Sequence, residues 1–178
     1  MSEDATSAKG NHILFVGFMG SGKTTVSKAL AARTGLALVD TDQRIEQVQG
    51  RAIKEIFAEA GEEGFRKIET ETLRGLAGLE RSVVSCGGGV VCNPVNRPIL
   101  SGLGTVVYLQ ISLEGCLARI PDTSTRPLLN GARPVQDIYC EQMPWYEQVA
   151  DITINVEEGS KDEIAEAVYA SLAKRGEL

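Results

Sequence analysis

The sequence feature that most constrains how this chain folds is a glycine-rich segment near the N-terminus. Residues 17–24 read GFMGSGKT and fit the pattern G-x-x-x-x-G-K-[ST]. They follow the apolar run 12–16 (HILFV), which is typical of a buried strand, and lead into a helical pattern over 23–33. A strand, a loop with accessible main-chain N–H groups and a helix N-terminus together form an anion-binding concavity. The sequence therefore predicts a phosphate-binding loop here.

Parts of this loop have distinct predicted roles toward a nucleotide. The Lys23 ammonium is long enough to reach the β- and γ-phosphates, and the Thr24 hydroxyl can bind Mg²⁺, the predicted cofactor. The nucleotide-binding residues predicted in this segment are Gly20, Ser21, Gly22, Lys23, Thr24 and Thr25.

Length and composition narrow the classes of protein that remain. A chain of 178 residues predicts one domain over residues 11–178, after a flexible tail over 1–10 without the apolar stretch of a signal peptide. The net charge of −6 disfavours nucleic acid and anionic membranes as partners, and the apolar runs are too short to span a bilayer. Four cysteines without paired spacing and a single histidine disfavour a zinc site, and reduced thiols favour the cytoplasm. We expect a monomer.

Strands and helices alternate along the whole chain. The strand patterns are continuous apolar runs, which is typical of a parallel sheet covered by helices on both faces. This predicts a three-layer α/β fold, with Ser160 and Glu163 forming a capping box at the last helix and residues 120–136 forming a lid. We expect strands at 12–16, 36–39, 82–85, 105–110 and 152–156, and helices at 23–33, 43–49, 53–58, 61–78, 94–100, 113–119, 137–149 and 160–173.

Two aspartates stand at the predicted end of the second strand, where ligands bind in parallel sheets. At extended spacing, Asp40 and Asp42 would point the same way, toward the phosphate loop. One would hold Mg²⁺ through water, and the other would orient an attacking hydroxyl or accept its proton. The alternative for Asp40 is the N-cap of the following helix.

A second group of candidates lies further along the chain. Arg66 and Glu69 share a helix face, so Arg66 could bind a substrate carboxylate while Glu69 fixes its conformation or holds a substrate hydroxyl, although this spacing more often gives a surface ion pair. Gly87, Gly88 and Gly89 directly follow a strand, as expected where a backbone passes close to a ligand, with a tight turn as the alternative.

Two arginines flank or occupy the predicted lid. Arg126 would stabilise the charge on the transferring phosphoryl group, and Arg119 would stack on the nucleotide base. Either residue alone is more often a solvated surface arginine. The sequence has no N-K-x-D motif and no acid at the end of the third strand, which disfavours a GTPase and a motor ATPase. A small-molecule kinase fits better, and a non-catalytic ATP-binding protein is the alternative.

Together these segments resemble the shikimate kinase family. The resemblance implies a nucleoside-monophosphate-kinase-like fold with strand order 2-3-1-4-5, and transfer of the γ-phosphoryl group of ATP to the 3-hydroxyl of shikimate, in the pathway to chorismate and aromatic amino acids. It implies that Asp42 contacts the acceptor hydroxyl and, through water, Mg²⁺. The matching segments are 17–26 (GFMGSGKTTV), 38–42 (LVDTD), 65–69 (FRKIE), 85–91 (SCGGGVV), 106–109 (VVYL), 126–129 (RPLL) and 144–151 (PWYEQVAD).

The resemblance also implies a substrate pocket, and there the chain departs from the family. Arg66 would bind the shikimate carboxylate, with Gly88 and Gly89 lining the pocket. The family normally has a second carboxylate-binding arginine at the position of Gln142. Losing that charge-assisted bond would cost ~1.5–3 kcal/mol of binding. Arg133 could replace it, shikimate could bind weakly, or the acceptor could be another small hydroxy acid or polyol.

Overall fold

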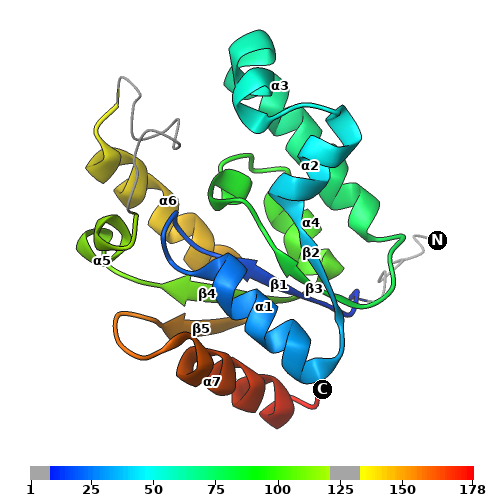
Figure 1. The fold of residues 1–178 in the computed structure, drawn as a ribbon, viewed down its shortest axis with the longest axis vertical. Coiled ribbons are helices and arrows are strands. Elements are labelled where there is room, and N and C mark those ends of the chain that lie inside the picture. Colours follow the sequence, from blue (N-terminus) through cyan, green and yellow to red (C-terminus); the bar gives the residue numbers. More distant parts are fainter. Residues whose placement is uncertain (1–8, 121–132) are drawn as a thin grey trace, which may run out of the picture.

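A five-stranded parallel sheet forms the centre of the computed structural model, which describes residues 9–120 and 133–178 (Figure 1). Its strand order is β2-β3-β1-β4-β5, which confirms the predicted α/β fold and strand order. The predicted strands are found within about one residue of their expected bounds. The strands are β1 (His12–Val16), β2 (Ala37–Asp40), β3 (Ser82–Ser85), β4 (Gly104–Gln110) and β5 (Ile152–Asn155).

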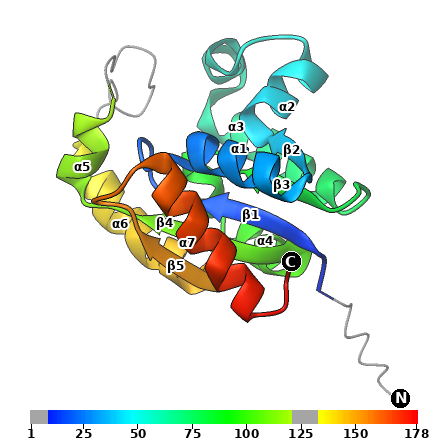
Figure 2. The ribbon, with the colours of Figure 1, turned by 60° about the horizontal axis from the view of Figure 1, so that its bottom comes forward.

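Helices cover both faces of this sheet. On one face α1 packs beside α7, and on the other α4 packs against α6 and α3 (Figures 1 and 2). None of the helices in the described ranges is long and apolar enough to cross a membrane. The helices are α1 (Lys23–Thr34), α2 (Thr41–Gln49), α3 (Ile53–Leu76), α4 (Asn96–Leu103), α5 (Leu113–Ala118), α6 (Val135–Val149) and α7 (Lys161–Lys174), with a 3₁₀ turn, η1 (Gly88–Val91), after β3.

The hydrophobic core lies around the three central strands. All residues of β1 and β3 are buried, as are all of β4 except the partly exposed Gln110. The edge strands β2 and β5 are partly exposed, because each has a neighbour on one side only. A second, smaller core of Ile45, Ile56 and Phe65 joins α2 to α3 beyond the edge of the sheet.

Several local predictions have definite outcomes. The Ser160–Glu163 capping box at the start of α7 is present. The helices predicted over 53–58 and 61–78 form one element, α3, with a kink at Gly61, whose φ of 67° lies outside the helical region. The three glycines at 87–89 enter the tight turn η1, so the turn alternative is correct for the backbone. Most of the predicted tail and lid, residues 1–8 and 121–132, lies outside the described residues.

Candidate active site

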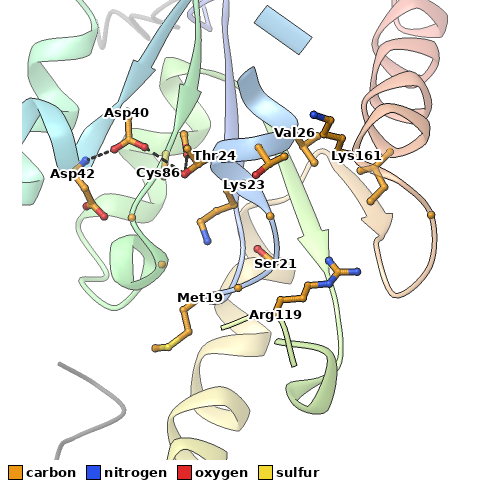
Figure 3. A pocket seen from close by; sticks show the side chains of 18 residues that line it. Met19, Ser21, Lys23, Thr24, Val26, Asp40, Asp42, Cys86, Arg119 and Lys161 are labelled. Carbon is orange, nitrogen blue, oxygen red and sulfur yellow. Dashed lines mark hydrogen bonds between the residues drawn. The ribbon is translucent and has the colours of Figure 1, made fainter. Parts of the chain in front are cut away.

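The phosphate-binding loop lies between β1 and α1, as the pattern predicts. Gly22 is the N-cap of α1 with a φ of 92°, a left-handed conformation that favours glycine. The Lys23 ammonium folds back over the loop and donates to the carbonyl oxygens of Gly17 at 2.8 Å and Phe18 at 2.9 Å. The lysine is thus held directly at the mouth of the loop (Figure 3).

A cavity of about 510 Å³ opens over this loop. It collects all of the predicted nucleotide-binding residues that the structure describes, together with both aspartates, and Figure 3 shows Asp40 and Asp42 on one side of Lys23 and Arg119 on the other. Its lining residues are Met19, Gly20, Ser21, Gly22, Lys23, Thr24, Thr25, Val26, Asp40, Asp42, Ser85, Cys86, Gly87, Gly88, Arg119, Gly159, Lys161 and Ile164.

The two carboxylate oxygens of Asp40 have different partners. Its Oδ1 accepts hydrogen bonds from the N–H groups of Asp42 at 3.0 Å and Gln43 at 3.1 Å, which makes it the N-cap of α2. Its Oδ2 accepts a 3.5 Å hydrogen bond from the Thr24 hydroxyl (Figure 3). The N-cap alternative is therefore correct, and the same carboxylate also faces the phosphate loop.

Asp42 reaches the cavity by a route that the sequence argument did not predict. The extended spacing assumed for Asp40 and Asp42 is wrong, because α2 begins at Thr41 and places Asp42 in its first turn. A helix turn still leaves both carboxylates on the wall of the same cavity. Both carboxylates therefore face the cavity as predicted, although the extended backbone assumed for them is wrong.

The donor atoms on this wall suit a hard cation. The Thr24 hydroxyl and the carboxylates of Asp40 and Asp42 are oxygen donors, which Mg²⁺ prefers. Within residues 9–120 and 133–178, no group of three or more His, Cys, Asp or Glu side chains could hold a metal by itself.

A second, smaller cavity of about 110 Å³ adjoins the first. The two cavities share Met19, Asp42, Gly87 and Gly88. Its lining is apolar in part, with the rings of Phe57 and Phe65 stacked at 4.5 Å, and it also includes the charged residues Asp42, Arg66 and Glu69. The cavity is lined by Met19, Asp42, Ile53, Phe57, Phe65, Arg66, Glu69, Gly87, Gly88 and Gly89.

Arg66 and Glu69 form a buried ion pair in this cavity. Arg66 Nη1 lies 2.9 Å from Glu69 Oε2, and the two side chains are 12% and 2% exposed. The surface pair favoured by spacing alone is therefore wrong, because the start of α3 and the glycine turn cover this helix face. Burial alone would lower the pKa of Arg66, but neighbouring charges, Glu69 first, raise it above its ordinary value. Burial raises the pKa of Glu69, although Arg66 acts to lower it.

The glycine turn packs closely against both charged groups. The Gly87 N–H donates to the buried Thr41 hydroxyl at 3.0 Å. A Cβ at Gly87 would lie 2.7 Å from Asp42 Oδ1, and one at Gly89 would lie 2.6 Å from Arg66 Nη1. A larger residue at either position would displace the Asp42 carboxylate or the Arg66 guanidinium, because these side-chain ends occupy the space that glycine leaves open.

Arg119 lies at the far end of the larger cavity, at the C-cap of α5. Its Nη2 donates to the carbonyl oxygen of Val156 at 2.6 Å, which ties it to the segment that leads into α7. Gly159 and Lys161 of that segment line the same cavity. Arg126 lies outside the described residues.

Gln142 lies apart from the other predicted site residues. It is 3% exposed, lines neither cavity, and contacts Cys92 and Tyr146 instead. Arg133, considered as its replacement, is exposed and pairs with Glu141 at 2.7 Å. Among the described residues that line the smaller cavity, Arg66 is the one cationic side chain.

Sequence reasoning assigned no role to several residues of the site. Met19 and Phe65 line the smaller cavity and Thr41 accepts from the Gly87 N–H, and all three stand inside quoted motif segments that contained a signal for them. Phe57 follows an ordinary apolar pattern, and Lys161 lies far from the loop in sequence. Nothing in the local sequence of these two distinguishes them from core or surface residues.

Comparison with known proteins decides the family. The profile of the family described as "Shikimate kinase" matches residues 19–173. The chain belongs to the shikimate kinase family. It is 41% identical over 162 residues to the shikimate kinase of Synechococcus elongatus, covering 89% of this chain and 84% of the relative. It is 43% identical over 149 residues to that of Chromobacterium violaceum, covering 82% and 80%.

Solved structures of the shikimate kinase family agree. Shikimate kinase from Acinetobacter baumannii in complex with shikimate superposes with a TM-score of 0.88 at 36% identity, covering 93% of this chain and 94% of that chain. The enzyme from Aquifex aeolicus gives a TM-score of 0.81 at 32% identity, covering 93% and 98%. The predicted function, that of a shikimate kinase and hence an ATP-dependent transferase, is confirmed at the level of the family.

Proposed function

We propose that this enzyme transfers the γ-phosphoryl group of ATP to the 3-hydroxyl of shikimate by direct in-line displacement. One observation carries the proposal: a phosphate-loop cavity and a smaller cavity with a buried arginine meet at a shared carboxylate, Asp42. A donor phosphate in the first and an alcohol in the second would meet beside that carboxylate. Such positioning supplies most of the catalysis in phosphoryl transfer.

The nucleotide would occupy the larger cavity. The Lys23 ammonium would exchange its two carbonyl acceptors for β- and γ-phosphate oxygens, while the amides of the loop and the N-terminus of α1 hold the phosphate chain. Arg119 would flank the base at the other end, and Arg126 would bridge the phosphates. Thr24, Asp40 and Asp42 would hold the magnesium ion. Its positive charge would neutralise the negative charge of the β- and γ-phosphates.

Shikimate would occupy the smaller cavity, with its carboxylate on Arg66. Glu69 holds the guanidinium in place at 2.9 Å. Gly88 and Gly89 would pass close to the ring, and Asp42 would take the proton of the attacking hydroxyl. The new bond joins that oxygen to the γ-phosphorus, the bond from this phosphorus to the β,γ-bridging oxygen breaks, and ADP leaves.

One observation favours a second candidate. Gln142 is neutral and lines neither cavity, so the carboxylate-binding charge in the described part of the smaller cavity comes from Arg66 alone. A polyol has no carboxylate and would need less positive charge, and another small hydroxy acid would place its carboxylate on Arg66 alone. The test is ADP release with ATP and Mg²⁺ in the presence of shikimate and of a panel of such acceptors. Turnover highest with shikimate supports the proposal, and a better acceptor contradicts it. Nucleotide binding without ADP release would indicate a non-catalytic ATP-binding protein.

The two central side chains can be tested by substitution. We expect Lys23→Ala and Asp42→Asn each to lower kcat at least about 100-fold, because each removes charge that acts on the transferring group. Circular dichroism should be unchanged. The matched controls are Lys28→Ala, exposed on the same helix, and Asp137→Asn, exposed in the first turn of α6. Near-normal rates in either test variant would contradict the assigned roles.

We also propose that the enzyme acts as a monomer in the cytoplasm. The four cysteines are free, as is typical of a reducing compartment. Elution at dimer mass, with activity that falls on dilution, would contradict the monomer.

A further inference from the structure

Helix α6 holds the glycine turn from the side opposite the cavities. The Tyr146 hydroxyl lies within hydrogen-bond distance of two acceptors, the carbonyl oxygen of Gly88 and, at 2.9 Å, Gln142 Oε1, which share its one proton. Gln142 Nε2 donates to Cys92 Sγ at 3.2 Å, and the Cys92 N–H donates to the carbonyl oxygen of Gly89 at 3.0 Å. Two side chains one helical turn apart on α6 thus hold both ends of the turn that runs from Gly88 to Cys92.

The two α6 side chains of this network are buried, and Gly88 and Cys92 are partly buried. Tyr146 is 0% exposed and Gln142 is 3% exposed. Burial raises the pKa of Tyr146 and raises that of Cys92 to about 11, so both groups keep their protons near neutral pH. A buried carbonyl oxygen that loses its donor is unfavourable by more than the hydrogen bond itself contributes. The Gly88 carbonyl is therefore restrained by Tyr146.

The restrained turn directly borders the smaller cavity, which is the proposed acceptor site. Gly88 lines both cavities, and Gly89 lies against the Arg66 guanidinium, with its ideal Cβ position 2.6 Å from Nη1. A displacement of the turn by a few tenths of an ångström would therefore change the space around the guanidinium. Gly88 also lies against the phosphate loop, its ideal Cβ position being 3.5 Å from Met19 N, whereas Arg66 lines the smaller cavity and not the larger one.

We propose that Tyr146 and Gln142 are positioning residues that fix the Gly88–Gly89 turn against Arg66 and so set the affinity for the acceptor. This inference rests on the proposed function and assigns Gln142 an indirect role in place of the substrate contact expected at its position. The two residues act through the main chain of the turn and touch neither substrate.

The test compares Tyr146→Phe with Tyr108→Phe in the full chain. Tyr108 is the matched control. It is 1% exposed, and its ring stacks on that of Tyr146 with a centroid distance of 5.3 Å. Its hydroxyl donates to Met143 Sδ at 2.9 Å. The readouts are KM for shikimate, KM for ATP, kcat and Tm. Trp145 is the one tryptophan of the sequence and stands beside Tyr146, so its fluorescence can report shikimate binding without ATP.

For Tyr146→Phe we expect KM for shikimate to rise about three- to tenfold, the value of one lost hydrogen bond, with KM for ATP changed less than about twofold. Tyr108→Phe should lower Tm similarly but leave both KM values unchanged. Gln142→Met, which keeps the volume and removes the amide, should raise KM for shikimate in the same way.

Three outcomes would overturn the inference. One is an unchanged KM for shikimate in Tyr146→Phe. A second, if that variant does not fold, is an unchanged KM for shikimate in Gln142→Met. A third is an equal rise in KM in Tyr108→Phe, which would indicate a general loosening of the core. Absence of shikimate turnover in the unaltered enzyme would instead overturn the proposed function, and this inference with it.

Discussion

At the scale of single residues, glycine leaves open the space that the charged groups of the smaller cavity, the proposed acceptor site, occupy. Gly87 lies against the Asp42 carboxylate and Gly89 against the Arg66 guanidinium. Asp40 also has two structural roles, because its Oδ1 caps α2 and its Oδ2 accepts a hydrogen bond from the Thr24 hydroxyl. Each of these positions serves the local backbone and the cavity together.

Gly89→Ala is the direct test of this packing. The added methyl would meet Nη1 and Cζ of Arg66 at 2.6 and 2.7 Å, so the guanidinium must move away from its position beside Glu69. We expect KM for shikimate to rise about tenfold and KM for ATP to change little. Gly102→Ala, in α4 with no atom within 4 Å of its Cβ position, is the control. Equal shikimate KM values in the two variants would contradict the packing argument.

At the scale of elements, α3 is one helix in two parts. Both parts contribute to the small core with Ile45 of α2, Ile56 from before Gly61 and Phe65 from after it, while Leu73 and Leu76 of the second part belong to the main core. The kink at Gly61 lets one element line the acceptor cavity with Ile53 and Phe57 from its first part and with Arg66 from its second.

Alanine substitution at two glycines of α3 should change the free energy of unfolding in opposite directions. Gly61 has a φ of 67°, which strains any residue with a Cβ, so Gly61→Ala should lower the free energy of unfolding by ~1–3 kcal/mol. Gly75 is helical with open space at its Cβ, so Gly75→Ala should raise it by up to ~1 kcal/mol. Urea unfolding measures both. Stabilisation by Gly61→Ala would mean that α3 runs through without a kink.

At the scale of the whole molecule, the two ends of the sheet have separate tasks. The carboxyl ends of β1, β2 and β3 lead into the phosphate loop, the aspartates and the glycine turn, where parallel sheets bind ligands. The opposite end holds His12, at the start of β1. Its Nδ1 accepts from the Ser82 N–H at 3.1 Å, and its Nε2 lies 3.0 Å from the carbonyl oxygen of Leu76.

His12→Ala tests this separation. It leaves the Ser82 N–H and the Leu76 carbonyl without their buried partner, so the free energy of unfolding should fall by ~2–4 kcal/mol. Because His12 is remote from both cavities, KM for each substrate should stay unchanged at a temperature where the variant is folded. A selective change in KM for shikimate would show that the two ends of the sheet are coupled.

Local patterns in the sequence determined most of the fold and the nucleotide half of the site. The strand–loop–helix around Lys23 depends on glycines and a lysine that are neighbours in the chain, so it can be predicted without knowing the rest of the molecule. The alternation of apolar strands and helices likewise predicts a covered parallel sheet. The resemblance to shikimate kinases added the strand order and the acceptor. The roles of Arg126 and the lid stay predictions.

Only the tertiary structure decided the acceptor half. Burial of the Arg66–Glu69 pair depends on the glycine turn and the first part of α3, which cover a helix face that spacing alone left exposed. Gln142 lies behind that turn because Tyr146 and Cys92, 4 and 50 positions away in the chain, are its neighbours in space. Which side chains share a cavity is set by the packing of distant segments, and sequence spacing does not contain that information.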